Sequence, residues 1–457
     1  MSITLGLERL FAVAPRLPYT RPTLHITGTN GKGSVSALLS SILLASGYRV
    51  GRFNSPHLVK IHDSITLDGG PVSVEEYERC TRMVEEAKKE TGAGLSNFEI
   101  LTMTALCVFE SAKVDIVILE VGLGGRLDAT NAVTDECILV SGLTTVDLDH
   151  QAFLGDTIEK IAREKAGIAR RGKPLVLGEQ LYDAVEPVVR DVLQDVGSPL
   201  SRPAFVGKQS SLFSPETRIG PFRPPPPQLL LAALPSLQER LSLEFPLQGD
   251  HQVANLATAL GMIDALRSYY PPYAARITAE TITLGVSKVS WPGRLSFHTI
   301  THPRPLLVLA DGAHNAGSAV TLGKYLSQYV STSTPGTTVS LILILGLSHS
   351  PTKAPLETLL PLLSVPSPPG IAVRLSVAPS SFSIPDAMPW VKPVPPTTIE
   401  SAVKEIDPSI KIQVTLTISE ALDWARKQPN GQADRELVIV AGSLYLVSDF
   451  YRLMTTG

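Results

Sequence analysis

The sequence predicts an α/β protein in which two series of strands alternate with helices. Short β-branched runs recur along the chain, and several lead through a glycine-rich turn into a helical stretch. One of them, residues 114–121 (VDIVILEV), is a largely apolar run of the kind expected for a parallel strand buried on both faces. This alternation favours a sheet covered by helices on both sides.

The first series occupies the N-terminal part of the chain. Its β-branched and apolar runs have the length of strands, and the stretch after the glycine-rich segment has the length and composition of a helix. We predict strands at Thr23–Thr27, 49–53, 114–121 and 138–142, and helices at 34–45 and 158–169.

A second series begins near Pro305. We place the boundary between Leu295 and Arg304, which gives domains of residues 1–297 and 304–457. Ser419 is a plausible cap for the last predicted helix. We predict strands at 306–309, 339–345, 371–376 and 437–441, and helices at 316–329 and 420–427.

The segment 200–240 between the two series is rich in turn-forming residues. It contains the pair Ser210-Ser211 and four consecutive prolines at 224–227. Proline favours polyproline or irregular backbone, so we expect a surface excursion here, most simply a loop without chemistry.

Composition excludes several classes of protein. The chain has 457 residues and a net charge of −3, which argues against nucleic-acid binding driven by charge. Apolar residues make up 44% and charged residues 18%, as in a folded globular protein. The three cysteines, Cys80, Cys107 and Cys137, form no CxxC pair, so neither a disulfide framework nor a cysteine zinc site is expected.

No feature of the chain predicts a membrane protein or an exported one. The densest apolar run, residues 339–347, is far shorter than a membrane helix. The N-terminus lacks a basic region and carries Glu8 where a signal peptide would be apolar. We expect a cytoplasmic location, with the mitochondrion as the alternative, and a monomer.

A candidate phosphate loop lies between the first strand and the first helix. Its sequence is Thr27-Gly28-Thr29-Asn30-Gly31-Lys32-Gly33-Ser34. Glycines let backbone N–H groups approach phosphate oxygens, and the helix N-terminus adds positive potential. The general motif G-x-x-x-x-G-K-[ST] is not met, because the glycine spacing is short and Gly33 follows the lysine. A simple turn is the alternative.

Three polar residues follow predicted strands, where the carboxyl ends of parallel strands form ligand sites. Ser55 precedes a proline and is held extended; an ordinary Ser-Pro turn is the alternative. Glu120 ends an apolar strand, where magnesium, a helix cap or an ion pair would each compensate its charge. His150 lies in a loop after another strand, and a structural histidine is the alternative.

The motifs taken together resemble the Mur ligase family, in particular its folate branch of dihydrofolate and folylpolyglutamate synthases. The phosphate loop T-G-T-N-G-K-G-S and the string E-V-G-L-G-G-R-L-D-A-T-N carry the resemblance most clearly. Eight motifs occur in family order between Leu5 and about Leu446, with gaps at 200–240 and 348–395. Within the branch, W-P-G-R-L, M-P-W and G-S-L-Y-L look most like the fungal enzymes. The resemblance implies a P-loop ATPase-like domain followed by a Rossmann-like domain.

The resemblance implies roles for residues of the first domain. It makes Ser55 and Glu120 magnesium ligands, puts His150 on a second magnesium, and has Lys165 carbamylated so that it holds the same ion. From the residues alone, Lys165 reads as a solvated helix lysine and Glu99 as an acid at a helix start. The nucleotide would be bound by Asn30, Gly31, Lys32, Gly33 and Ser34, and the pteroate substrate by Leu7, Phe98, Glu99, Leu127, Asp128 and Ala129.

Further implied roles belong to motifs in the second half of the chain. Asn255, which also reads as a helix cap, would hold adenine, and Arg294 and Asp311 would contact the nucleotide. His314 would lie near the incoming glutamate. The last motif, G-S-L-Y-L at 442–446, is expected near the same amino acid.

The resemblance implies a two-step ligation. ATP would phosphorylate the carboxylate of 7,8-dihydropteroate, and the amine of L-glutamate would displace the phosphate to give 7,8-dihydrofolate. Lys32, Lys165 and His150 would be catalytic, with ATP and two Mg²⁺ ions required, and the second domain would close on the first. The alternative is addition of glutamate to tetrahydrofolate, alone or as a second activity. A non-catalytic ATP-binding protein is the remaining rival.

Overall fold

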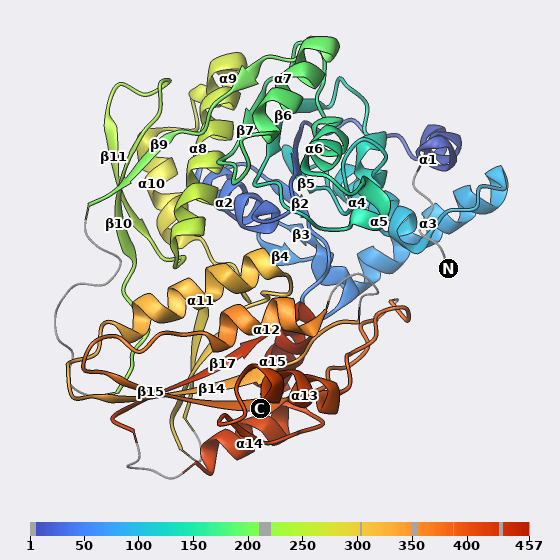
Figure 1. Cartoon of the computed structure of the whole chain (residues 1–457). Coiled ribbons are helices and arrows are strands. Elements are labelled where there is room, and N and C mark those ends of the chain that lie inside the picture. Colours follow the sequence, from blue (N-terminus) through green and yellow to red (C-terminus); the bar gives the residue numbers. More distant parts are fainter. Residues whose placement is uncertain are drawn as a thin grey trace. The chain divides into compact units, whose positions relative to one another are not determined.

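The chain folds into two α/β units, each built on its own main sheet (Figure 1). The computed structural model describes residues 6–209, 221–301, 304–349, 354–386, 388–428 and 433–456. Unit 1 comprises Met1–Gln209, Leu229–Pro246 and Asp250–Ser290, and unit 2 comprises Ser210–Gln228, Leu247–Gly249 and Trp291–Gly457.

The boundary lies a few residues before the predicted one, at Ser290/Trp291 instead of between Leu295 and Arg304. The reason is strand β12 (Ser296–Ile300), which pairs antiparallel with β13 (Leu306–Ala310) and so joins the sheet of unit 2. The predicted linker is therefore part of a β-hairpin.

Unit 1 contains an eight-stranded sheet in the order β4-β3-β2-β5-β1-β6-β7-β8. Strands β2, β5, β1, β6, β7 and β8 run parallel, whereas β3 and β4 are antiparallel additions at one edge. The strands are β1 Thr23–Thr27, β2 Val50–Phe53, β3 Ile65–Leu67, β4 Gly70–Pro71, β5 Ile116–Glu120, β6 Ile138–Leu143, β7 Leu175–Leu177 and β8 Leu200–Ser201. All residues of β1, β5 and β6 are buried, which agrees with the predicted two-sided coverage.

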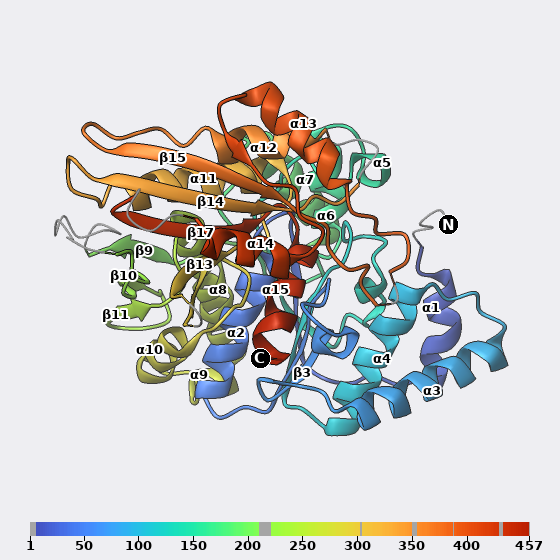
Figure 2. The same ribbon diagram turned by 90° about the horizontal axis from the view of Figure 1, so that it is seen from below.

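Helices cover both faces of this sheet (Figures 1 and 2). On one face α2 packs on β5, and α8 packs on β6 and β7. On the other, α1, α3 and α4 share one hydrophobic core with the sheet, and α6 and α7 share another. The helices are α1 Glu8–Val13, α2 Lys32–Ala45, α3 Val74–Thr91, α4 Asn97–Ala112, α5 Gln151–Leu154, α6 Ile158–Ala166, α7 Val185–Val196, α8 Asp250–Tyr269, α9 Pro271–Ala274 and α10 Ala279–Lys288, with 3₁₀ turns η1 Ala14–Arg16, η2 Ile61–Ser64 and η3 Ala129–Ala132.

The proline-rich segment is more ordered than predicted. Strands β9 (Phe205–Lys208) and β10 (Gln228–Ala233) lie in it, and with β11 (Arg240–Phe245) they form a three-stranded sheet. Alternate residues of β10 are buried, which is a strand signal that the prolines concealed. Phe222 is buried and stacks on Tyr329 within unit 2, with a centroid separation of 4.8 Å. The pair Ser210-Ser211 lies outside the described residues.

Unit 2 contains a six-stranded sheet in the order β12-β13-β17-β14-β15-β16, parallel except for β12. The remaining strands are β14 Thr338–Leu345, β15 Ala372–Pro379, β16 Lys411–Ile412 and β17 Arg435–Ala441. Its helices are α11 Ala316–Val330, α12 Pro355–Leu363, α13 Pro396–Ile406, α14 Ile418–Arg426 and α15 Leu444–Thr456. The predicted Rossmann-like order of elements is thus present.

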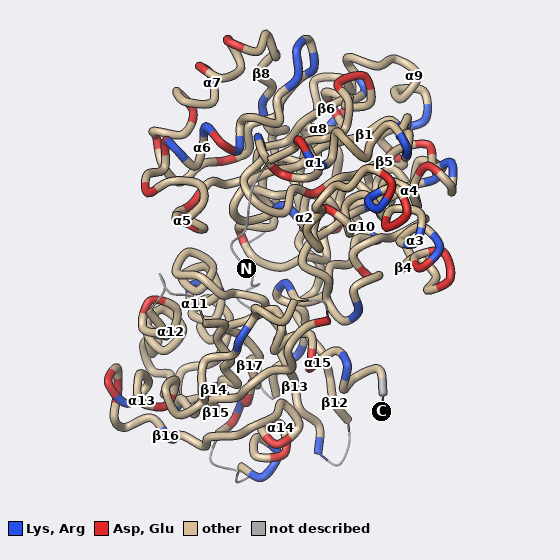
Figure 3. The backbone as a smooth tube through the Cα atoms, turned by 90° about the vertical axis from the view of Figure 1, so that its right-hand side faces the viewer, with Lys and Arg blue, Asp and Glu red and all other residues tan. Residues whose placement is uncertain are grey.

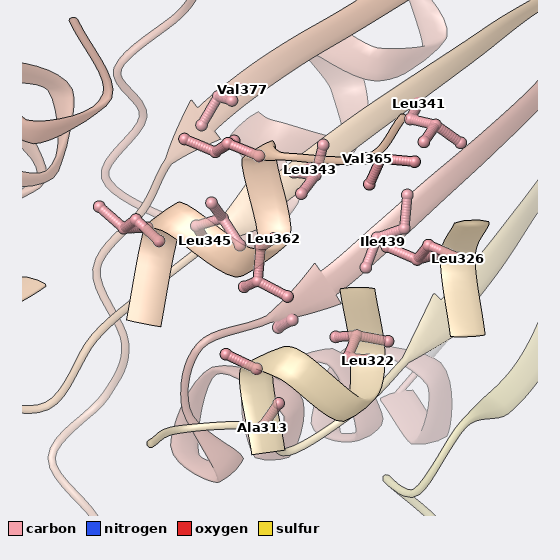
Figure 4. Close-up of a cluster of buried hydrophobic side chains, with 14 of the residues drawn as sticks. Ala313, Leu322, Leu326, Leu341, Leu343, Leu345, Leu362, Val365, Val377 and Ile439 are labelled. Atoms are coloured by element: carbon pink, nitrogen blue, oxygen red, sulfur yellow. The ribbon is translucent and has the colours of Figure 1, made fainter. Parts of the chain in front are cut away.

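Alternation along the strands explains how unit 2 is layered. Leu341, Leu343 and Leu345 of β14 point toward Leu322 of α11 and Leu362 of α12 (Figure 4). The intervening residues of β14 face the other side, where α14 contacts β14 and α15 contacts β17. Charged residues gather on outer helices such as α3, α6 and α7, whereas the central strands carry few (Figure 3).

Two predicted helix caps differ from the structure. Thr417, rather than Ser419, caps α14, because its side chain accepts a hydrogen bond from Glu420 N at 3.2 Å. Asn255 does not cap α8, which already begins at Asp250.

Among the described residues, no helix is long and apolar enough to cross a bilayer.

Candidate active site

The predicted phosphate loop connects β1 to α2, as its motif requires. Gly28 and Gly31 adopt φ angles of 145° and 95°, a region that side chains rarely enter. A Cβ atom at Gly28 would overlap Thr144 Oγ1, and one at Gly31 would overlap Asn255 Oδ1. Glycine is therefore required at both positions. The second contact also shows that α8 brings Asn255 against the loop, and its predicted role in holding adenine stays a prediction.

The loop that follows β6 holds the phosphate loop in shape. Thr29 N donates to Thr145 O at 2.9 Å, and Thr144 Oγ1 donates to Asn30 O at 2.7 Å. Asp147 N donates to Thr29 Oγ1 at 3.0 Å. These bonds join residues more than 100 positions apart, so the loop is preorganised by its neighbour in the sheet.

Two lysines converge on one carbonyl oxygen of the phosphate loop. Lys32 Nζ donates to Gly28 O at 3.0 Å, and Lys165 Nζ donates to the same oxygen at 2.7 Å. Lys165 is buried, so it is not the solvated helix lysine that its local sequence suggests. Burial and, to a smaller extent, the Lys32 charge lower the pKa of Lys165 to about 7, against the opposing effect of Asp149 and Asp128.

The predicted magnesium ligands Ser55 and Glu120 lie on adjacent strand ends. Glu120 ends β5 and is buried, and it lies beside Ile26 of β1 in the sheet register. Asn54 Nδ2 donates to Glu120 Oε2 at 2.6 Å, which places the neighbouring Ser55 in the same region. The sequence analysis gave Asn54 no role, and it missed this contact.

His150 occupies the loop just before α5, where its side chain is exposed and its φ angle is 53°. Its backbone N–H donates to Asp149 Oδ1 at 2.8 Å. Asp149 in turn is close enough to act on the pKa of Lys165. His150 is therefore next in the chain to a residue that acts on Lys165, and its role as a ligand of the second ion stays a prediction. The described residues contain no cluster of three or more His, Cys, Asp or Glu side chains that could hold a metal by themselves.

The residues assigned to pteroate gather around the start of α4 and the loop 122–131. The ring of Phe98 packs over Gly122, where a Cβ atom would overlap it. Glu99 forms an ion pair with Arg9 at 2.9 Å and accepts from Ser96 N at 2.7 Å, so it caps α4 as well as lining this region. Leu7 packs against the hydrophobic core that α1, α3 and α4 form with the sheet, as Phe98 does.

Asp128 organises the loop that carries Leu127 and Ala129. Its carboxylate accepts from Leu123 N at 2.8 Å and from Thr130 Oγ1 at 2.6 Å, and burial raises the pKa of Asp128. A buried histidine that sequence reasoning missed extends this network: His25 Nε2 lies 2.9 Å from Thr130 Oγ1. Burial lowers the pKa of His25 to about 3, so the ring is neutral.

Unit 2 brings its three assigned residues together. Asp311 accepts from Leu295 N at 2.8 Å and from Ala313 N at 2.9 Å, which holds Leu295 at a φ of 45°. A Cβ atom at Gly312 would overlap Arg294 Nη1, so the two residues touch. His314 Nδ1 lies 2.8 Å from Gly312 O.

Comparison with known proteins covers the whole chain. The family model described as the C-terminal domain of dihydrofolate synthetase matches residues 294–453. Dihydrofolate synthetase of Saccharomyces cerevisiae is 32% identical over 462 residues, which cover 99% of this chain and 98% of that protein. The dihydrofolate synthase/folylpolyglutamate synthase of Escherichia coli is 42% identical over 204 residues, 44% of this chain and 46% of that protein.

Solved structures agree with these relatives. E. coli FolC in complex with DHPP and ADP has a TM-score of 0.75 and 28% identity, covering 100% of this chain and 94% of that one. A bifunctional folylpolyglutamate synthase/dihydrofolate synthase with Mn, AMPPNP and L-glutamate bound has a TM-score of 0.73 and 28% identity, covering 99% and 95%. The chain belongs to the dihydrofolate synthase/folylpolyglutamate synthase family and has its Mur ligase fold.

Proposed function

We propose that this protein ligates L-glutamate to 7,8-dihydropteroate at the expense of ATP, giving 7,8-dihydrofolate, ADP and phosphate. The observation that carries the proposal is the braced phosphate loop of unit 1, with Lys32 and Lys165 on the Gly28 carbonyl and Glu120 at the end of the adjacent strand. A relative similar over its whole length is named dihydrofolate synthetase, which supports the same substrate.

The chemistry follows from the poor reactivity of a carboxylate with an amine. In the first step a pteroate oxygen attacks the γ-phosphorus of ATP, the bond to the β-phosphate oxygen breaks, and ADP leaves. The glutamate amine then attacks the acyl carbon, the C–O bond to phosphate breaks, and the amine loses a proton. Lys32 and the loop N–H groups would stabilise the negative charge of the transferring phosphoryl group.

The residues present fit a magnesium ion. Magnesium prefers oxygen ligands, and the Ser55 hydroxyl and the Glu120 carboxylate offer them beside the phosphate loop. Glu120 Oε2 accepts a hydrogen bond from Asn54 Nδ2, which holds the carboxylate in place. Bound magnesium would neutralise phosphate charge and help to orient the nucleotide.

We further propose that Lys165 carries a carbamate and, with His150, serves the second ion. Support comes from the buried position of the amine beside Lys32 and from its neutral form at moderate pH. The ammonium group first loses a proton, and the neutral amine nitrogen then adds to the carbon of CO₂ and releases a second proton, so that a cation becomes an anion. The ¹³C NMR spectrum of protein equilibrated with ¹³C-bicarbonate should show a carbamate signal in wild type and none in Lys165→Ala.

The test of function is a substrate comparison. ADP release is measured with ATP, Mg²⁺ and L-glutamate, using either 7,8-dihydropteroate or tetrahydrofolate as acceptor. We expect turnover with dihydropteroate, and turnover with tetrahydrofolate alone would contradict the choice. The alternative of folylpolyglutamate synthase activity is favoured by bacterial relatives that carry both names.

A further inference from the structure

The carboxylate of Glu120 has an unusually close partner in Asn54. Asn54 directly follows β2. Because Phe53 pairs with Leu119, Asn54 is level with Glu120 at the carboxyl ends of these two parallel strands. The Asn54 amide nitrogen lies 2.6 Å from Glu120 Oε2, and the two side chains are 7% and 4% exposed. A short, buried hydrogen bond of this kind restricts the rotamer of both side chains.

The chemistry of the pair fixes the orientation of the Asn54 amide. An ionised carboxylate only accepts hydrogen bonds, so the amide must present its nitrogen and not its oxygen. Arg52 of β2, two residues before Asn54, is also near Glu120: burial lowers the pKa of Arg52, the Glu120 charge opposes this shift, and the resulting value is about 10.

We propose that Asn54 is a positioning residue of the divalent-cation site, holding the Glu120 carboxylate in one orientation so that it can bind the ion beside the phosphate loop. This inference rests on the proposed function, since it takes Glu120 to be a metal ligand. It assigns a role to a residue that the sequence analysis did not single out. Partners of this kind orient metal ligands, and their loss typically weakens metal binding by about 10- to 100-fold.

The experiment measures Mn²⁺ binding directly. Free Mn²⁺ is followed by electron paramagnetic resonance as the ion is titrated into full-length protein saturated with ADP. Asn54→Leu keeps the side-chain size and removes the donor, and we expect it to weaken Mn²⁺ binding by about 10- to 100-fold. If that variant fails to fold, Asn54→Ala removes the donor without adding bulk and carries the same expectation.

A matched control separates positioning from a general loss of packing. Ser198 is also buried in unit 1 and donates a hydrogen bond of 2.7 Å to Lys173 O, and Ser198→Ala should leave Mn²⁺ affinity unchanged. A second readout is the dependence of turnover on metal concentration. Asn54→Leu should raise the Mn²⁺ concentration needed for half-maximal turnover, while saturating Mn²⁺ restores most of kcat.

The outcomes distinguish this inference from the proposed function. Wild-type Mn²⁺ affinity in folded Asn54→Leu or Asn54→Ala would overturn the inference, whatever the enzyme's substrate. A tenfold or greater loss in every Asn54 variant that folds, with none in Ser198→Ala, would support it. If wild type turned over neither pteroate nor folate and Mn²⁺ binding still required Asn54, the proposed function would fall and the positioning role would stand.

Discussion

The two units hold their candidate site residues in different ways. In unit 1 the decisive contacts join distant parts of the chain, as in Lys165 to Gly28 and Asn54 to Glu120, which are 137 and 66 positions apart. In unit 2 Asp311 bonds to Leu295, 16 positions away, and His314 lies against the nearby Gly312. The unit 1 site therefore depends on the assembled sheet, whereas the unit 2 turn is stabilised mainly by its own hairpin.

The largest expected effect tests the chemical role of unit 1. Lys32→Ala removes the ammonium group of the phosphate loop, and we expect ADP release to fall by about 100- to 1000-fold, the usual loss when a donor to transition-state charge is removed. Circular dichroism should show an intact fold. Lys404→Ala, which removes an exposed cation of unit 2, is the control and should retain full activity.

The next effect separates the two units by pH. His25 stays neutral in the folded protein down to a pKa of about 3, whereas the unfolded chain binds a proton near 6.5. The contribution of His25 to the free energy of unfolding is therefore fully present above pH 6.5 and is lost as the pH falls toward 3. At pH 5 the loss from this residue is about 2 kcal/mol. Hydrogen exchange of unit 1 peptides at pH 7 and pH 5 should show the loss.

The matched variant is His25→Gln. Its side-chain amide N–H can replace the ring N–H as a donor to Thr130, but glutamine does not titrate. Its unit 1 peptides should lose less protection on acidification than those of wild type. Equal losses in both proteins would show that His25 does not govern the acid response. His298 in unit 2 has a pKa lowered by burial too, but its ring is only half-buried, so a smaller response is expected there.

A smaller effect tests the local turn of unit 2. Asp311→Asn replaces one acceptor oxygen with a donor and leaves either Leu295 N or Ala313 N without its partner. We expect unit 2 to lose about 1.5 kcal/mol. The three tryptophans, at positions 291, 390 and 424, all lie in unit 2, so fluorescence-detected urea unfolding reports on it. An unchanged midpoint would mean that the turn is held by other contacts.

The smallest effect concerns a helix cap in unit 2. Thr417→Ala removes the acceptor for Glu420 N and should cost about 1 kcal/mol in the same assay. Ser419→Ala lies inside α14 and should change stability by less than about 0.5 kcal/mol. A larger cost at position 419 than at 417 would contradict the observed cap.

The sequence by itself determined the elements whose signals are local. Strand Thr23–Thr27 has its predicted bounds, and the phosphate loop and Glu120 stand where strand ends and glycines indicated. Apolar periodicity and glycine spacing report on neighbouring residues, so they suffice for such features. Local signals failed at β10, where prolines concealed the strand, and at the cap of α14, where two hydroxyl residues, Thr417 and Ser419, lie two positions apart.

Only the tertiary structure decided which residues meet. The order β2-β5-β1-β6 places Asn54 beside Glu120 and Thr144 beneath the phosphate loop, and it buries Lys165 against Gly28. Parallel strands are joined by long crossovers, and no local pattern states which strand will be a neighbour. Hydrogen bonding and pKa at the site follow from that order, because they depend on groups that the chain brings together only when it folds.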